Sequence, residues 1–296
     1  MKTCMFTVSF AGFWGQAELT LEQSIDKIAD LGFQGIEIMG KRPHLSPLDY
    51  SLDDCKRLRE QLDRRGLDVA AVAGYTNFTG GMNSAEVPFM DMQIAYVAAL
   101  ARRAEALGGD LVRIFTSYER DDVPLGRQWR QTVAAIGECC DRAAAYGVTI
   151  GVQNHHDIGV DTKAFAELLC QVDRSNAIPM YDCWSIHLRG EDIAAGVAAL
   201  GPAMRFTTVA DYVTLPRARY CPELVNYLDV QPPLVIAVPM GKGDLDYPTF
   251  FDGLDEAGFD GWVSYEMCSP LRDGGKLDVL EMYARAFLEY MTPRTA

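Results

Sequence analysis

Two carboxylates in the chain directly follow apolar runs, where a charged side chain would otherwise be buried. Asp182 ends the run that begins at Ile178, and Glu266 ends the run that begins at Trp262. Burying a carboxylate costs free energy unless it is paired, hydrogen-bonded or bound to a metal. An ion pair would account for one such residue, but two of them with polar neighbours favour a site. A carboxylate such as Glu266 could then move a proton from a carbon next to a carbonyl.

Histidines gather near the same positions. Three of the four in the chain are His155, His156 and His187. Gln153 and His155 are two residues apart, so in an extended strand both point to one side and His156 points to the other. A histidine beside a strand is often a hydrogen-bonded core residue, but an imidazole near a carboxylate can also carry a proton. We therefore take His155 and His187 as candidate acids and expect His156 to face outward.

Several other residues could contact a substrate. Trp14 and Trp184 could form an apolar wall against a sugar ring, or could pack in the core. Glu37 and Arg113 lie in expected strands, where an internal ion pair is a better explanation than substrate contact. Arg217 could reach over a site from its long loop or remain solvated.

These residues need elements that bring them together, and the chain alternates between short apolar runs and amphipathic helices. The expected strands occupy residues 4–9, 35–39, 68–74, 111–116, 148–154, 178–182, 205–210 and 262–266. Cap residues and terminal glycines mark the helices between them, as in the helices that begin at Thr20 and Ser51. Alternation of this kind implies parallel strands joined by right-handed helical crossovers.

A closed barrel and an open, doubly wound sheet both satisfy this pattern. Eight regular units favour closure, and no GxGxxG follows the first strand, which counts against a dinucleotide-binding sheet. The sequence therefore predicts a single (β/α)8 TIM barrel over residues 1–296, with its site at the carboxyl ends of the strands. The proline-rich excursion 213–247 is too long for an ordinary loop. It is expected to be an active-site cover or an oligomer contact, or alternatively a surface excursion with a short edge strand at 234–238.

Composition argues against several classes of partner. The formal net charge of −14 disfavours binding to nucleic acid or to an anionic membrane. No run of about 18 apolar residues occurs, so no membrane span is expected. The eight cysteines include no CxxC pair and are expected to be reduced thiols. Because the first residues show no secretion signal, the protein is expected to be cytoplasmic.

Three local segments resemble the xylose-isomerase-like sugar isomerase/epimerase superfamily of barrels. These segments are GFQGIE at 32–37, GDLDY at 243–247 and GFDGWVSYE at 258–266. The superfamily includes ketose 3-epimerases, inosose dehydratases and isomerases, and related carbohydrate lyases. The resemblance spans nearly the whole chain, and it implies a small carbohydrate substrate and a homo-oligomer.

The resemblance also implies one divalent metal, held by Glu, Asp, His and Glu at the ends of the last four strands. Asp182 and Glu266 match two of these ligands, whereas Gln153 replaces the first Glu and Thr208 replaces the His. Asp211 matches the Asp that normally follows that His by three residues. The site loses one negative charge and its imidazole, so its affinity for a metal should fall.

Two outcomes remain open for this metal. Gln153, Asp182 and Glu266 could hold Mn, Mg, Co or Zn, with His155 or His187 supplying the missing nitrogen. Alternatively, the metal is lost and hydrogen bonds hold the substrate. The family's epimerases use the first and last Glu as acid and base on opposite faces of the substrate, and Gln153 cannot accept a proton at neutral pH.

We therefore expect an isomerase- or epimerase-type enzyme that moves a proton next to the carbonyl of a sugar, keto-sugar or cyclitol through an enediolate. Glu266 would be the base. One alternative is a lyase or dehydratase that eliminates a β-hydroxyl group from a keto-sugar. Another is a sugar-binding or partner subunit whose catalytic set has decayed. A DNA-repair endonuclease on the same barrel is disfavoured by the small number of histidines and by the acidic composition.

Overall fold

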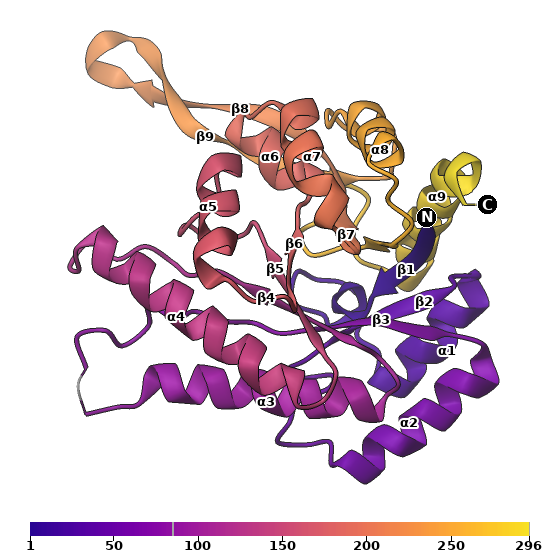
Figure 1. Ribbon diagram of the computed structural model, residues 1–296. Helices are drawn as coiled ribbons and strands as arrows, with labels where there is room; N and C mark the ends of the chain where they lie inside the picture. The colour runs from indigo at the N-terminus through magenta and orange to yellow at the C-terminus, as the bar shows by residue number, and fades with distance from the viewer. Residues whose placement is uncertain (85, 296) are drawn as a thin grey trace.

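Eight parallel strands form one sheet in the computed structural model, which describes residues 1–84 and 86–295; residues 85 and 296 of the predicted domain lie outside this description. The strands are β1 (Lys2–Phe6), β2 (Gly35–Met39), β3 (Asp68–Ala73), β4 (Leu111–Phe115), β5 (Thr149–Gln153), β6 (Ala177–Met180), β7 (Phe206–Val209) and β10 (Trp262–Tyr265). Their order across the sheet is β6-β5-β4-β3-β2-β1-β10-β7. Figure 1 shows the helices arranged around these strands, and the predicted single TIM barrel is confirmed.

The helices follow the strands in turn. They are α1 (Leu21–Leu31), α2 (Leu52–Arg65), α3 (Phe89–Ala106), α4 (Leu125–Ala144), α5 (Thr162–Val172), α6 (Cys183–Arg189), α7 (Ile193–Leu200), α8 (Tyr247–Glu256) and α9 (Leu277–Met291). Single 3-10 turns lie at Thr7–Phe10, Gly201–Ala203, Pro222–Leu224 and Thr292–Arg294. None of the helices in the described part of the chain is long and apolar enough to cross a membrane.

Strands β6 and β7 lie at the two ends of the sheet order, and side-chain hydrogen bonds connect β7 to the residue that follows β6 and to the end of β5. The hydroxyl of Thr207 donates to the carbonyl oxygen of Tyr181 (2.9 Å). One residue further along β7, the Thr208 hydroxyl accepts a hydrogen bond from Nε2 of Gln153 (3.3 Å). These contacts complete the circle of strands, so that inward-pointing side chains from all sides of the sheet meet at the barrel axis.

Alternation along each strand decides which side chains enter the barrel. In β4, Val112 and Ile114 belong to the main core, which packs strands against helices. Leu111 belongs instead to a separate cluster inside the barrel, and Arg113 and Phe115 line a cavity above it. The same period of two brings polar residues of other strands to the carboxyl end of the barrel.

The excursion after β7 is a long antiparallel hairpin of β8 (Asp211–Cys221) and β9 (Asn226–Val238), which extends away from the barrel in Figure 1. The expected edge strand at 234–238 was too short, because β9 covers 13 residues. The hydrogen-bond ladder between β8 and β9 shifts register around Pro216. The unpaired residues of β9 opposite this shift include Pro232 and Pro233. Prolines fit there because they have no N–H to donate to a ladder.

Candidate active site

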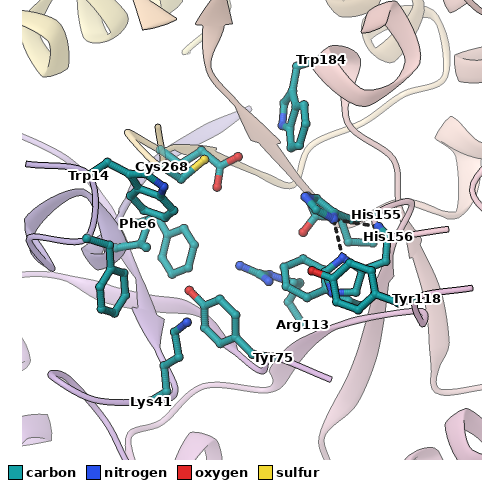
Figure 2. A pocket seen from close by; sticks show the side chains of 15 residues that line it. Phe6, Trp14, Lys41, Tyr75, Arg113, Tyr118, His155, His156, Trp184 and Cys268 are labelled. Carbon is teal, nitrogen blue, oxygen red and sulfur yellow. Dashed lines mark hydrogen bonds between the residues drawn. The ribbon is translucent and has the colours of Figure 1, made fainter. Parts of the chain in front are cut away.

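The carboxyl ends of the strands surround a cavity of about 380 Å³, shown in Figure 2. Its polar lining comes from five strands or from the loops that follow them, and it includes Lys41, Tyr75, Arg113, Gln153, His155, His156 and Glu266. Aromatic rings complete the wall, among them Trp14 from the first loop and Trp184 from α6. Most of the residues singled out in the sequence therefore meet at the expected end of the barrel.

Glu266 is the carboxyl group that lines this cavity. It directly follows β10, it is only 5% exposed, and its Oε1 has no hydrogen-bond partner among the described residues. Burial and the nearby charge of Glu37 raise the pKa of Glu266 to about 8, although Arg113 acts in the opposite direction. A carboxyl group that titrates near neutral pH and has a free oxygen can both take and deliver a proton.

Gln153, at the end of β5, is bonded to two neighbouring strand ends. Its Nε2 donates to Oδ2 of Asp182 (3.0 Å) and to Oγ1 of Thr208 (3.3 Å). The other oxygen of Asp182 caps α6 by accepting the N–H of Ser185 (2.8 Å). Helix α6 begins directly after Asp182, so this carboxylate also serves as a helix cap, a role that the sequence pattern does not predict.

This arrangement does not fit the divalent metal that the resemblance implies. Gln153 turns an N–H group toward Asp182 and Thr208, where a cation would need oxygen lone pairs. Among the described residues, the oxygens at these strand ends without a hydrogen-bond partner are Oε1 of Gln153, a neutral amide oxygen, and Oε1 of Glu266, so only one of them belongs to a carboxyl group. Within residues 1–84 and 86–295, no group of three or more His, Cys, Asp or Glu side chains is placed to hold a metal. The chemistry of the cavity is therefore derived from the side chains alone.

A buried ion pair lies beside the cavity. Nε of Arg113 is 3.3 Å from Oε1 of Glu37 in β2, and Ser264 in β10 donates to the other oxygen of Glu37 (2.7 Å). This is the internal ion pair that the sequence favoured. The guanidinium of Arg113 also lies over the ring of Phe115, 4.4 Å from its centroid, and lines the cavity. Its positive charge can stabilise negative charge that develops on a bound molecule.

His155 and His156 both line the cavity, so the expectation that His156 faces outward was wrong. Strand β5 ends at Gln153, and His156 has a left-handed backbone with φ of 73°, so the strand period does not extend to it. The two Nδ1 atoms are 2.8 Å apart. Burial lowers the pKa of His155 to about 3 and that of His156 to about 4. Both rings are thus neutral at pH 7 and carry no extra proton to donate as an acid.

Five predicted site residues lie outside the cavity lining, namely Glu37, Asp182, Thr208, His187 and Arg217. The first three contact residues that line it. His187 is in the last turn of α6, and Arg217 is in β8, where its Nη1 donates to the carbonyl oxygen of Pro232 (2.9 Å). Asp211 has a structural role, because it accepts the N–H of Gly243 (2.8 Å) and anchors that loop. A Cβ atom on Gly243 would lie 2.0 Å from the Asp211 carboxylate, which explains the glycine of the GDLDY segment.

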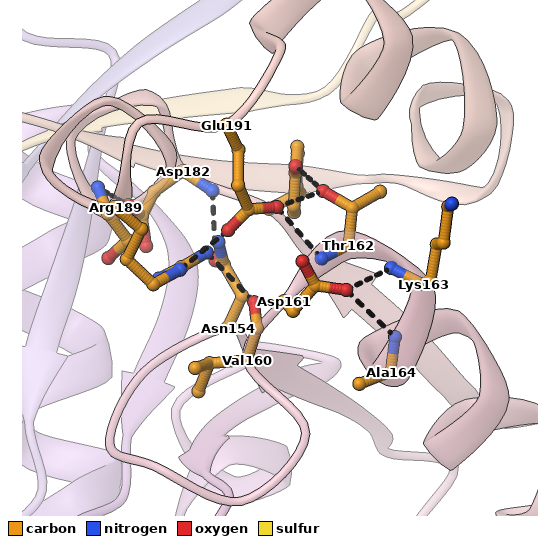
Figure 3. A network of polar contacts seen from close by, with 11 residues as sticks. Asn154, Val160, Asp161, Thr162, Lys163, Ala164, Asp182, Arg189 and Glu191 are labelled. Carbon is orange, nitrogen blue, oxygen red and sulfur yellow. Dashed lines mark hydrogen bonds and ion pairs between the residues drawn. The ribbon is translucent and has the colours of Figure 1, made fainter.

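A polar network holds the carboxyl ends of β5 and β6 in place (Figure 3). Oδ1 of Asn154 accepts the backbone N–H of Asp182 (3.0 Å). Glu191 accepts the N–H of Thr162 (2.9 Å) and pairs with Nε of Arg189 (2.6 Å). These contacts connect the start of α5 to the end of α6, and they fix the segment that carries Asp182.

Sequence reasoning missed Lys41 and Tyr75. Each follows a strand by two residues, since β2 ends at Met39 and β3 ends at Ala73. Both of these strand-end residues belong to an apolar cluster inside the barrel. Continuing the period of two past the strand ends would have found Lys41 and Tyr75.

The chain has recognisable relatives. Residues 25–285 match the family described as Xylose isomerase-like TIM barrel. The inosose dehydratase of Geobacillus thermodenitrificans (strain NG80-2) is 24% identical to this chain over 258 residues, which cover 84% of this chain and 82% of that protein.

Solved structures share the fold at lower identity. The IOLI protein, whose structure holds a zinc atom, has a TM-score of 0.76 at 18% identity, with 100% of both chains covered. D-psicose 3-epimerase, solved in the presence of D-fructose, has a TM-score of 0.74 at 16% identity, with 98% of both chains covered. Since the family match extends over most of the barrel and the fold agrees with it, this chain belongs to the Xylose isomerase-like TIM barrel family.

Proposed function

We propose that the protein is a lyase that removes water from a small polyhydroxylated ketone, either a keto-sugar or a ketocyclitol. The supporting observation is that, among the described residues, the cavity is lined by one carboxyl group with an unpaired oxygen, Glu266, and by the amide of Gln153. A cavity of about 380 Å³ suits a single sugar-sized ring. The similarity to an inosose dehydratase supports elimination as the type of reaction.

The amide at Gln153 argues against epimerisation, which was the first expectation. Inverting a carbon centre requires one group to take a proton from one face and a second group to deliver a proton to the other face. An amide can do neither at neutral pH. Elimination and aldose–ketose isomerisation both proceed with one proton carrier on one face, so isomerisation is the second candidate.

Glu266 carries the proton in both halves of the proposed elimination. Its carboxylate takes the proton from the carbon next to the ketone, and the C–H electron pair forms an enolate. The positive charge of Arg113, which lines the cavity, stabilises the enolate oxygen. The enolate then re-forms the C=O bond and a C=C bond forms as the bond to the β-hydroxyl breaks. The hydroxyl takes the proton from Glu266 and leaves as water, so no oxidant and no second base is required.

The reaction is tested by incubating the protein with an inosose and, separately, with a ketose, and following the product by mass spectrometry and near-ultraviolet absorbance. Elimination lowers the mass by one water and produces a conjugated ketone. Isomerisation leaves the mass unchanged in ordinary water and, when run in deuterium oxide, exchanges a carbon-bound proton. Either result assigns the reaction to one of the two candidates.

The role of Glu266 is tested by Glu266→Gln, which keeps the shape of the side chain. We expect a loss of turnover of about 10²–10⁴-fold, the usual contribution of a positioned acid–base group. Glu60→Gln, on the exposed face of α2, is the matched control and should keep full activity. Full turnover by Glu266→Gln would remove this residue from the mechanism. Sugar binding by the wild-type protein without any turnover would favour the decayed sugar-binding subunit.

A further inference from the structure

The proposed elimination makes no use of Lys41 and Tyr75, which lie on the same side of the cavity as Arg113 in Figure 2. The hydroxyl of Tyr75 is buried and has no hydrogen-bond partner within the described residues. The ammonium of Lys41 lies over two aromatic rings, 3.8 Å from the centroid of Tyr75 and 4.9 Å from that of Phe13. Both polar groups therefore border the same part of the cavity.

While Glu266 is protonated, positive charge is in excess on this side of the cavity. The charge of Arg113 is balanced by Glu37 at 3.3 Å. Lys41 forms no ion pair with any carboxylate of the described residues, and its pKa is lowered by burial and by the neighbouring charge of Arg113. A local excess of positive charge is unusual in a chain whose formal net charge is −14.

One bound group would satisfy both side chains. A buried hydroxyl without an acceptor and a half-buried ammonium beside a second cation are each unfavourable in the protein alone. An oxyanion offers several lone pairs, so it can accept hydrogen bonds from the Tyr75 hydroxyl and the Lys41 ammonium at once. A neutral hydroxyl group on a ligand would pair with Tyr75 but would leave the charge of Lys41 unbalanced.

We infer that Lys41 and Tyr75 form an anion subsite, which binds a carboxylate or phosphate group carried by the ketone that Glu266 dehydrates. The identity of the ligand as that ketone rests on the proposed function, whereas the preference for an anion rests on the geometry of Lys41 and Tyr75. The substrate is then an acidic polyhydroxylated ketone, with its ketone end near Glu266 and its anionic group near Lys41.

The subsite is tested by calorimetry with two ring polyols, quinate, which bears a carboxylate, and myo-inositol, which bears none. We expect quinate to bind about 10- to 100-fold more tightly, the range of a charge-assisted hydrogen bond. Lys41→Met keeps the length of the stem but removes the charge, and it should abolish this preference. Tyr75→Phe keeps the ring over which Lys41 lies and should weaken quinate binding by a smaller factor. Lys56→Met, which removes an exposed lysine of α2, is the control and should bind like the wild type.

A third ligand, myo-inositol 1-phosphate, distinguishes the two sources of the anion. A preference for either anion that disappears in Lys41→Met supports the subsite and shows whether it takes a carboxylate or a phosphate. Equal binding of all three compounds, no binding of either anion, or a preference that survives in a folded Lys41→Met overturns it. An anion preference without dehydration of either an inosose or a carboxylate-bearing polyhydroxylated cyclic ketone would refute the proposed function alone. Dehydration of an inosose without an anion preference would refute the subsite alone.

Discussion

Replacing Glu266 by glutamine should stabilise the protein, and the gain should grow with pH. Burial raises the pKa of this carboxyl from 4.5 to about 8 in the fold. As the pH rises between these values, the unfolded chain loses the proton before the folded chain does, so the stability of the wild type falls. One pKa unit corresponds to about 1.4 kcal/mol, so the loss reaches about 4–5 kcal/mol above pH 8 and nearly vanishes below pH 4. Glutamine has the same shape and does not ionise, so the variant should not show this loss.

Thermal unfolding of the wild type and of Glu266→Gln at pH 5, 7 and 9, in a buffer with a chelator, measures this difference. For a chain of this size, 4 kcal/mol corresponds to roughly 8 °C in Tm. At pH 9 the Tm of the variant should therefore exceed that of the wild type by about this amount. At pH 5 the two curves should nearly coincide, and exposed Glu60→Gln should follow the wild type throughout. A difference in Tm that stays constant with pH would refute the inference that Glu266 is protonated in the fold. So would a variant that is less stable than the wild type at pH 9.

Four further predictions address the rest of the site and the hairpin. kcat/KM should rise with pH up to about pH 8, because Glu266 must ionise before it can take a proton; a flat profile between pH 6 and 8 would contradict this. Gln153→Glu adds a third carboxylate and should raise the affinity for Mn²⁺ at least tenfold by calorimetry, while a chelator should leave wild-type activity intact. Arg113→Met leaves Glu37 buried and unpaired, which should cost about 3–5 kcal/mol in urea unfolding; a change of well under 1 kcal/mol would show that the pair is not needed. Replacing 216–233 with a two-residue turn should preserve the barrel and lower the number of chains per particle, measured by light scattering, because this hairpin exposes several large apolar side chains. An unchanged number of chains would argue against an oligomer contact.

The barrel could be predicted because its signals are local. Thr20 and Ser51 cap α1 and α2 as expected, each accepting the N–H of the third helical residue. The apolar runs became strands, and their number favoured closure. The hairpin after β7 was underestimated because its prolines suggested irregular chain. Pro216 and Pro232 instead lie at a register shift, where a ladder needs no N–H from them.

The position of the candidate site could be predicted from the sequence, but the chemical roles of its residues could be predicted only in part. Asp182 and Glu266 lie at the carboxyl end of the barrel, as expected for polar residues that follow apolar strands. The oxygens of Asp182 are nevertheless occupied by a helix cap and by the amide of Gln153. His155 reaches the cavity but is neutral there, because burial lowers its pKa to about 3.

The sequence by itself determined the alternation of strands and helices, the helix caps and the end of the barrel where polar groups gather. Each of these features depends on residues a few positions apart. Only the tertiary structure decided which groups share one cavity and in what state. Arg113 meets Glu37 across 76 positions of chain, and Lys41 reaches Tyr75 from another strand end. Hydrogen-bond partners and pKa values depend on such distances and on burial, neither of which can be read from spacing along the chain.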